Sequence, residues 1–126
     1  GDVIEAFKMV EVTPELDGPA RRDLTMGTNN VYVGVARLEL HLPEARSLKA
    51  KRSATRPLAE RIRGRHQVLV SEVDHQHLHQ RAAFAIAGLS TNAQDLESRL
   101  ERVRTTVDET WSGFILEWDV EIIQLD

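Results

Sequence analysis

The feature that most constrains the fold of this chain is the order of its hydrophobic periods. From residue 31 onward, the spacing of apolar residues changes from a period of two to a period of about 3.6 and back. A period of two is typical of a strand with one buried face, and the longer period is typical of a helix with a buried stripe. The sequence therefore predicts the order strand, helix, strand, strand, helix, strand.

The predicted strands are bounded by residues that commonly interrupt a β-ladder or a helix. Pro43 ends the first alternating segment, and Ser112 with Gly113 precedes the last one. The expected strands are residues 31–42, 67–73, 82–89 and 114–125, with a polar turn at 74–79. In the last strand, alternation places one apolar set on a single face: Phe114, Leu116, Trp118, Val120 and Ile122.

The first helical segment lies between Glu44 and Arg65 and contains Pro57. A proline in a helix interior removes one hydrogen bond and costs about 3 kcal/mol. Two alternatives follow: a kink near Ser53, or a second helix with Pro57 in its first turn. Gly64 is expected to end the helix. The expected buried stripe contains Leu48, Thr55, Leu58, Ala59 and Ile62.

The second helix begins with a capping-box pattern formed by Thr91 and Gln94. Asp95 and Arg99 stand four residues apart and should form an ion pair on its surface. The apolar residues behind this start recur at helical spacing, at Ala93, Leu96, Leu100, Val103 and Val107.

This order of elements predicts an α+β domain over residues 31–126. We expect a ferredoxin-like βαββαβ sandwich, in which two helices cover one face of a four-stranded antiparallel sheet. Residues 1–12 alternate like a short strand, and residues 13–30 contain proline and glycine without periodicity, which predicts a flexible linker.

Basic charge is concentrated in the first predicted helix. The chain carries 16 basic and 20 acidic residues, so its net charge of −4 does not favour general binding of polyanions. Half of the basic residues nevertheless lie in residues 44–65, beside only Glu44 and Glu60. This segment is where an anion would be attracted.

Three stretches of the sequence carry a family resemblance: YVGVARLELHLPEARSLKAKRS from Tyr32, SEVDHQ from Ser71, and QRAAFAIAGLS from Gln80. Together they resemble the YlxP-like family, a small bacterial group of unknown function. The resemblance implies a ferredoxin-like domain whose genes tend to lie among translation genes. Residues 1–12, GDVIEAFKMVEV, are similar to the C-terminal end of bacterial translation initiation factor two. An initiation factor fragment joined to the domain would reflect either a natural fusion or an error in gene prediction.

The basic helix and the family resemblance together predict contact with the ribosome or another structured RNA. Basic groups on a helix bind phosphates without reading sequence, so no sequence-specific recognition of DNA is expected. The competing explanation is a solvated helix face whose charge is balanced by the acidic residues of the second helix and the last strand. The predicted RNA-binding residues are Arg46, Lys49, Lys51, Arg52, Arg56 and Arg63.

The uncovered face of the sheet supports a different prediction. Its charged residues should include Glu117, Asp119 and Glu121, and no exposed aromatic residue is expected there. An acidic face of this kind would repel a phosphate backbone, so RNA should bind the helix side or a loop. The same face should also carry apolar residues beside these charges: Val31, Val33, Val35, Ile115 and Ile123. The alternative function is therefore a protein-interaction module, in which this open face forms a homodimer without nucleic acid.

The segment from Asp74 to His79 has the pattern D-H-x-H-x-H. In an extended strand, His75, His77 and His79 would point the same way and could converge on a zinc-type ion. The segment has the composition of a turn, however, so an exposed polar turn is favoured and no metal site is predicted.

No catalytic residues are predicted. Glu72 and Asp74 project to the same side of a strand, and paired carboxylates can act as acid and base. No nucleophile with its base accompanies them, so pairing with Arg81 is favoured and neither an enzyme nor a cofactor is expected. The chain lacks cysteine, which fits a reducing cytoplasm, and it lacks an apolar run of about 20 residues that would span a membrane.

Overall fold

The computed structural model describes residues 30–125. The strand-like segment predicted at residues 1–12 and its similarity to initiation factor two lie outside the described residues, as does the predicted linker up to residue 29. Within the described part, neither helix is long and apolar enough to cross a membrane.

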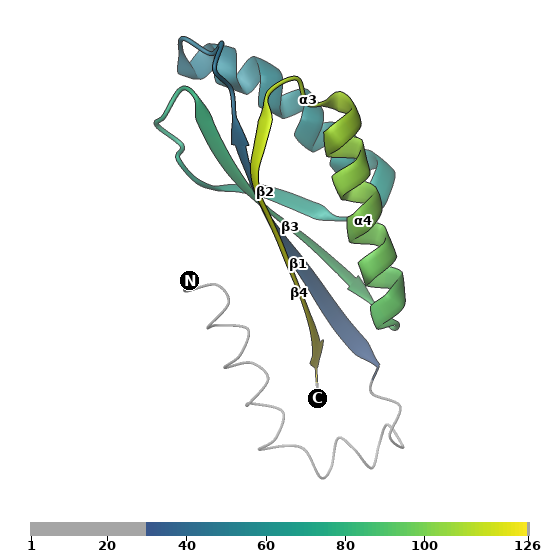
Figure 1. The fold of residues 1–126 in the computed structure, drawn as a ribbon. Helices are drawn as coiled ribbons and strands as arrows, with labels where there is room; N and C mark the ends of the chain where they lie inside the picture. The colour runs from purple at the N-terminus through teal and green to yellow at the C-terminus, as the bar shows by residue number, and fades with distance from the viewer. Residues whose placement is uncertain (1–29, 126) are drawn as a thin grey trace.

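The described chain forms one four-stranded antiparallel sheet with two helices on one side (Figure 1). The sheet order is β2-β3-β1-β4, so the two strands that each precede a helix are central and adjacent. The predicted ferredoxin-like βαββαβ sandwich is therefore confirmed. The elements are β1 (Val31–His41), α3 (Leu48–His66), β2 (Leu69–Asp74), β3 (Arg81–Ser90), α4 (Ala93–Thr110) and β4 (Phe114–Leu125).

The core lies between the sheet and the two helices. Ala36, Leu38 and Leu40 alternate along β1 and are fully buried, as a strand with one covered face requires. The facing helices contribute stripes at helical spacing. The helical core residues are Leu58, Ala59 and Ile62 from α3, and Leu96, Leu100, Val103 and Val107 from α4.

Helix α4 lies close to the sheet above two paired glycines, Gly34 on β1 and Gly88 on β3. A Cβ atom on Gly34 would lie 3.1 Å from Leu100 Cδ1, and one on Gly88 would lie 3.4 Å from Leu96 Cδ2. Because neither glycine has a side chain, α4 can approach the sheet closely at this point.

Helix α3 is one continuous helix from Leu48 to His66, and Pro57 lies inside it. A second helix starting at Pro57 is therefore excluded, and Gly64 does not end the helix. The last position is followed by Gln67, which adopts the left-handed conformation (φ 53°). Burial of the apolar stripe against the sheet outweighs the hydrogen bond that the proline removes.

The start of α4 also differs from the prediction by one residue. Asn92, and not Thr91, is the N-cap: its side-chain oxygen accepts hydrogen bonds from the backbone of Gln94 (2.8 Å) and Asp95 (3.2 Å). The predicted pair between Asp95 and Arg99 is confirmed, with a nitrogen–oxygen distance of 2.8 Å.

Strand β4 has the predicted bounds but contains a bulge. Glu39 lies opposite Glu117, whereas the next residue of β1 lies opposite Ile115, so Leu116 is an extra residue. Ile115 consequently packs against the core, and Phe114 lies opposite His41 with 61% of its surface exposed. The prediction that Phe114 and Leu116 share the buried face of the strand is wrong, because alternation does not continue across a bulge.

Candidate nucleic-acid interface

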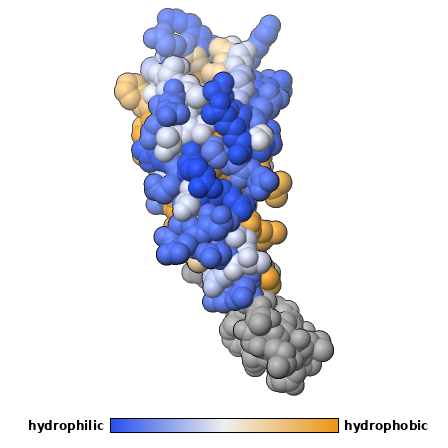
Figure 2. Space-filling view, turned by 90° about the vertical axis from the view of Figure 1, so that its right-hand side faces the viewer, coloured by the Kyte–Doolittle hydropathy of each residue, from blue (hydrophilic) through white to orange (hydrophobic). Residues whose placement is uncertain are grey.

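The basic segment of α3 presents most of its charge to solvent. Lys49, Arg52, Arg56 and Arg63 are exposed, and their spacing of three, four and seven residues places them on one face of the helix. We call these four residues the basic face. Figure 2 shows that the side of the molecule bearing the helices is hydrophilic over most of its surface.

The basic face lacks acidic partners within the described chain. None of its four residues forms an ion pair with another described residue, and the same holds for the exposed neighbours on and just before α3. Arginines elsewhere in the described chain do pair: Arg37, Arg81, Arg99 and Arg104 each contact a carboxylate. No ion pair within the described chain therefore holds these four groups, although Glu60 and Glu72 line a groove together with three of them.

Three residues of the basic face also line a groove of about 330 Å³ between α3 and β2. Arg52, Arg56 and Arg63 contribute to it from the helix, and Glu72 and Phe84 from the sheet. One guanidinium is held in place, because Nη2 of Arg63 donates a hydrogen bond of 3.0 Å to the carbonyl of Val70. The groove thus offers a partly fixed set of donors beside an edge strand.

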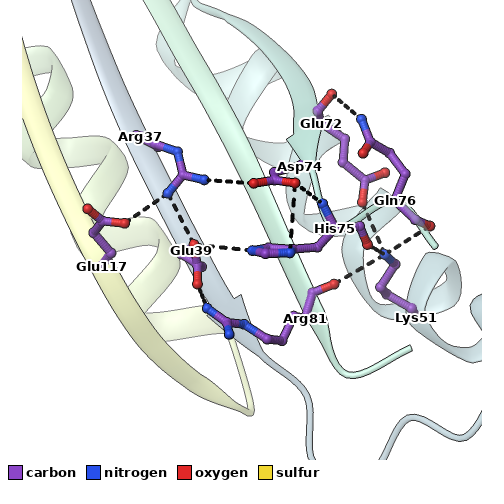
Figure 3. A network of polar contacts seen from close by, with 9 residues as sticks. All are labelled: Arg37, Glu39, Lys51, Glu72, Asp74, His75, Gln76, Arg81 and Glu117. Atoms are coloured by element: carbon purple, nitrogen blue, oxygen red, sulfur yellow. Dashed lines mark hydrogen bonds and ion pairs between the residues drawn. The ribbon is translucent and has the colours of Figure 1, made fainter. Parts of the chain in front are cut away.

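Lys51 does not belong to this surface. Its side chain is 2% exposed, and its ammonium group lies 3.2 Å from the carboxylate of Glu72. The same nitrogen donates to the carbonyl oxygens of His75 (2.8 Å), Arg81 (3.2 Å) and Gln76 (3.4 Å) (Figure 3). The prediction that Lys51 contacts RNA is therefore wrong, because its charge is used inside the protein.

The sequence contained a signal for this burial. Lys51 stands four residues before Thr55 and therefore lies on the same stripe as the buried residues of α3. A lysine at such a position can bury its apolar stem and extend its ammonium group to partners at the edge of the core. The total charge of the segment does not reveal this position, whereas the helical spacing does.

A second polar cluster lies on the open face of the sheet (Figure 3). Glu39 is 7% exposed, although it projects away from the helices, because Arg37, His75 and Arg81 surround its carboxylate. Nη1 of Arg37 lies 3.1 Å from Glu39 and 2.8 Å from Glu117.

The predicted pairing of Asp74 or Glu72 with Arg81 is not seen. Arg81 contacts Glu39, and Asp74 contacts Arg37 at 3.6 Å.

The three histidines after β2 do not converge on one point. His75 has a positive φ of 61° and turns the chain, so that its ring lies beside Glu39 (3.5 Å). His77 and His79 instead line a separate hollow at the end of the sheet. Residues 30–125 contain no group of three or more side chains arranged to hold a metal ion.

The other end of the open face is apolar. Leu69 on β2 and Leu89 on β3 are 75% and 64% exposed, and they border a hollow of about 640 Å³. Val33 and Ile123 pair on the same face. The homodimer predicted from the sequence would form its contact at this apolar end of the open face.

Comparison with known proteins identifies the family. The family model described as "Protein of unknown function (DUF503)" matches residues 33–120, which is more than half of the chain. The uncharacterized protein YlxP of Bacillus subtilis (strain 168) is 33% identical over 76 residues, which cover 60% of this chain and 83% of that protein.

Two solved structures have a similar arrangement of elements. The de novo designed protein Foldit4 is 14% identical with a TM-score of 0.46, and the match covers 74% of this chain and 93% of that one. A protein described as an antibiotic biosynthesis monooxygenase from Nitrosomonas europaea is 16% identical with a TM-score of 0.41, over 76% and 90% of the two chains. At these scores neither structure informs function. The sequence matches do identify the family: the chain belongs to the DUF503 family of proteins of unknown function, and its YlxP-like resemblance is confirmed.

Proposed function

We propose that this domain binds structured RNA, with the ribosome as the setting, through the basic face of α3, and that its role is binding without catalysis. The observation that carries the proposal is that none of Lys49, Arg52, Arg56 and Arg63 forms an ion pair with another described residue. The translation-gene neighbourhood that the family resemblance implies supports ribosomal RNA as the partner, in the cytoplasm.

Unpaired charges favour this role for an energetic reason. A phosphate that binds a free guanidinium does not have to displace a carboxylate of the protein, and counterions released from the RNA add to the affinity. From Lys49 to Arg63 the helix rises about 21 Å, at 1.5 Å per residue, so the basic face can reach several phosphates. Such contacts give affinity and orientation without sequence reading.

The dependence of binding on salt tests the proposal. The variant R52Q/R56Q removes two charges from the basic face, and we expect the slope of log K against log salt concentration to fall by about 0.7 to 0.9 for each lost contact. The matched control is R102Q, which removes one exposed and unpaired charge from α4 and should leave the slope unchanged. Failure of the wild-type protein to bind ribosomes at low salt would refute the proposal.

Self-association through the open face is the second candidate function. Its specific support is the exposure of Leu69 and Leu89 at the apolar end of a face whose other end carries Arg37 and Glu39, which already neutralise each other. Burying this face against a second copy would leave these two charges paired. The variant L89D should convert a dimer to a monomer in light scattering without unfolding it. A wild-type monomer at high concentration would exclude this candidate.

A further inference from the structure

The bulge in β4 assembles a row of three flat side chains across the open face. Arg81 on β3 lies opposite His41 on β1, and His41 lies opposite Phe114 on β4. The rings of His41 and Phe114 are stacked, with centroids 6.0 Å apart and an interplanar angle of 25°. Phe114 is 61% exposed, and the side chain of Arg81 is 43% exposed. The row therefore presents an aromatic surface to solvent.

Two features fix the row in position. Gly113 passes so close to His41 that a Cβ atom would overlap the carbonyl oxygen of His41, so the backbone itself holds Phe114 against the histidine. On the other side, Arg81 contacts the buried carboxylate of Glu39. A platform held by the backbone and by an ion pair loses little conformational entropy when a ligand binds.

A hollow of about 440 Å³ adjoins the row. His41 and Arg81 line it together with His77 and His79 from the β2–β3 turn. The side chain of Arg81 lines this hollow and is 43% exposed while it contacts Glu39, so its guanidinium can also donate to a ligand there. The hollow thus combines flat rings with donors, which is the chemistry that unpaired nucleobases use when proteins bind them.

The hollow also lies at the same end of the molecule as the start of α3. Nε2 of Gln80 donates to the carbonyl oxygens of Pro43 (3.2 Å) and Ala45 (3.4 Å), which fixes the β2–β3 turn to the loop before the helix. Arg46 and Lys49 follow directly along the chain. A strand whose base enters the hollow can therefore continue toward the basic face.

We propose that the row of Arg81, His41 and Phe114, with the adjoining hollow, binds one unpaired nucleobase of the RNA. This inference rests on the proposed function and specifies it further, because it requires a single-stranded loop or end beside the phosphates bound by α3. It also revises the expectation that the open face lacks exposed aromatic residues, since the bulge turns Phe114 outward.

Binding of a fluorescein-labelled RNA hairpin with an unpaired loop, compared with a blunt duplex of the same stem, tests this inference. F114A should weaken hairpin binding by about 5- to 150-fold, the range that stacking of one base covers, and should leave duplex binding unchanged. F114W should restore binding, and its fluorescence should be quenched by the hairpin. The control L116A removes a neighbouring exposed side chain and should change neither affinity.

The salt series separates this inference from the proposed function. F114A should lower affinity without changing the salt slope, because stacking releases no counterions, whereas R52Q/R56Q should reduce the slope. If R52Q/R56Q weakens binding and F114A binds the hairpin as the wild type does, the base site is refuted and the phosphate surface stands. If the wild-type protein binds neither RNA, both are refuted. Circular dichroism of each variant checks that the fold is retained.

Discussion

At the scale of single residues, the position of a charge decides its role more than its presence does. Lys49 and Lys51 stand two residues apart in the same basic segment. The first is exposed, and the second is 2% exposed and bound by a carboxylate and three carbonyl oxygens. Only the exposed lysine can contribute to an RNA-binding surface.

Lys51 should therefore be a stability residue. K51M leaves the partly exposed carboxylate of Glu72 and the surrounding carbonyls without their cation, and we expect a loss of about 1 to 3 kcal/mol in the free energy of unfolding. The control K49M changes an exposed side chain and should stay within about 0.5 kcal/mol of the wild type. Urea denaturation measures both. Equal stabilities would show that the ammonium group is not held as described.

His66 at the end of α3 should make stability depend on pH. Burial lowers the pKa of His66 below its ordinary value of 6.5, and the charges of Arg102 and Arg65 lower it further. Its ring nitrogen Nε2 lies 2.8 Å from the hydroxyl of Thr106. Because the unfolded chain binds a proton more readily, the free energy of unfolding should fall as pH drops below 6.5 toward the lowered pKa.

Urea unfolding at several pH values from 7.5 down to 5 measures this dependence. H66Q should reduce the decline in stability on acidification, and R102Q should reduce it in part, because it removes one cause of the lowered pKa. A decline that is the same in H66Q and the wild type would assign the pH dependence to other groups.

At the scale of elements, hydrophobic periodicity predicted which helices and strands form. It did not predict the residues at which the helices begin and end, or which face each residue of β4 occupies. All four strands and both helices appear in the predicted order. The alternation of β4 correctly predicted its bounds. The bulge at Leu116, however, places Ile115 toward the core and Phe114 on the open face, which is the reverse of the prediction. No pattern in one strand reveals a bulge, because the extra residue is defined by the partner strand. Continuity of α3 through Pro57 likewise depends on tertiary packing that periodicity does not measure.

Two glycines in these elements should respond oppositely to substitution. G113A introduces a Cβ atom that would overlap a backbone oxygen of β1, and we expect destabilisation of about 1 to 3 kcal/mol. G64A lies inside α3 with nothing within 4 Å of its new Cβ, so it should stabilise the protein by about 0.5 to 1 kcal/mol. Thermal denaturation measures the sign of each change, and stabilisation by G113A would contradict the close approach of β4 to β1.

At the scale of the whole molecule, the surface divides into regions of different character. The basic face lies on the helix side, and the open face combines a neutralised ion-pair cluster with an apolar end. Sequence reasoning located the basic helix, but it missed the ion-pair cluster, the groove and the aromatic row. Each of these features combines residues from several elements. Which of those residues lie side by side depends on the register between strands, and the periodicity of one segment does not reveal that register.

Charge reversal on the basic face should abolish association with ribosomes. The variant K49E/R52E/R56E replaces attraction by repulsion, so co-sedimentation at low salt should be lost while the melting temperature stays close to that of the wild type. R102E on α4 serves as the control and should still co-sediment. Co-sedimentation of the triple variant would show that another surface makes the contact.

The contacts of the buried ammonium group of Lys51 have a consequence for any RNA that binds both the basic face and the row of Arg81, His41 and Phe114. Lys51 ties α3 to the turn that carries His77 and His79, so the basic face and the proposed base site are joined through the protein interior. Two contacts held at a fixed separation act as a bivalent receptor, in which the first contact raises the effective concentration of the second. That gain is available only to an RNA whose loop and backbone match the separation. The domain would then select its partners by the spacing of their parts, although none of its contacts reads a sequence.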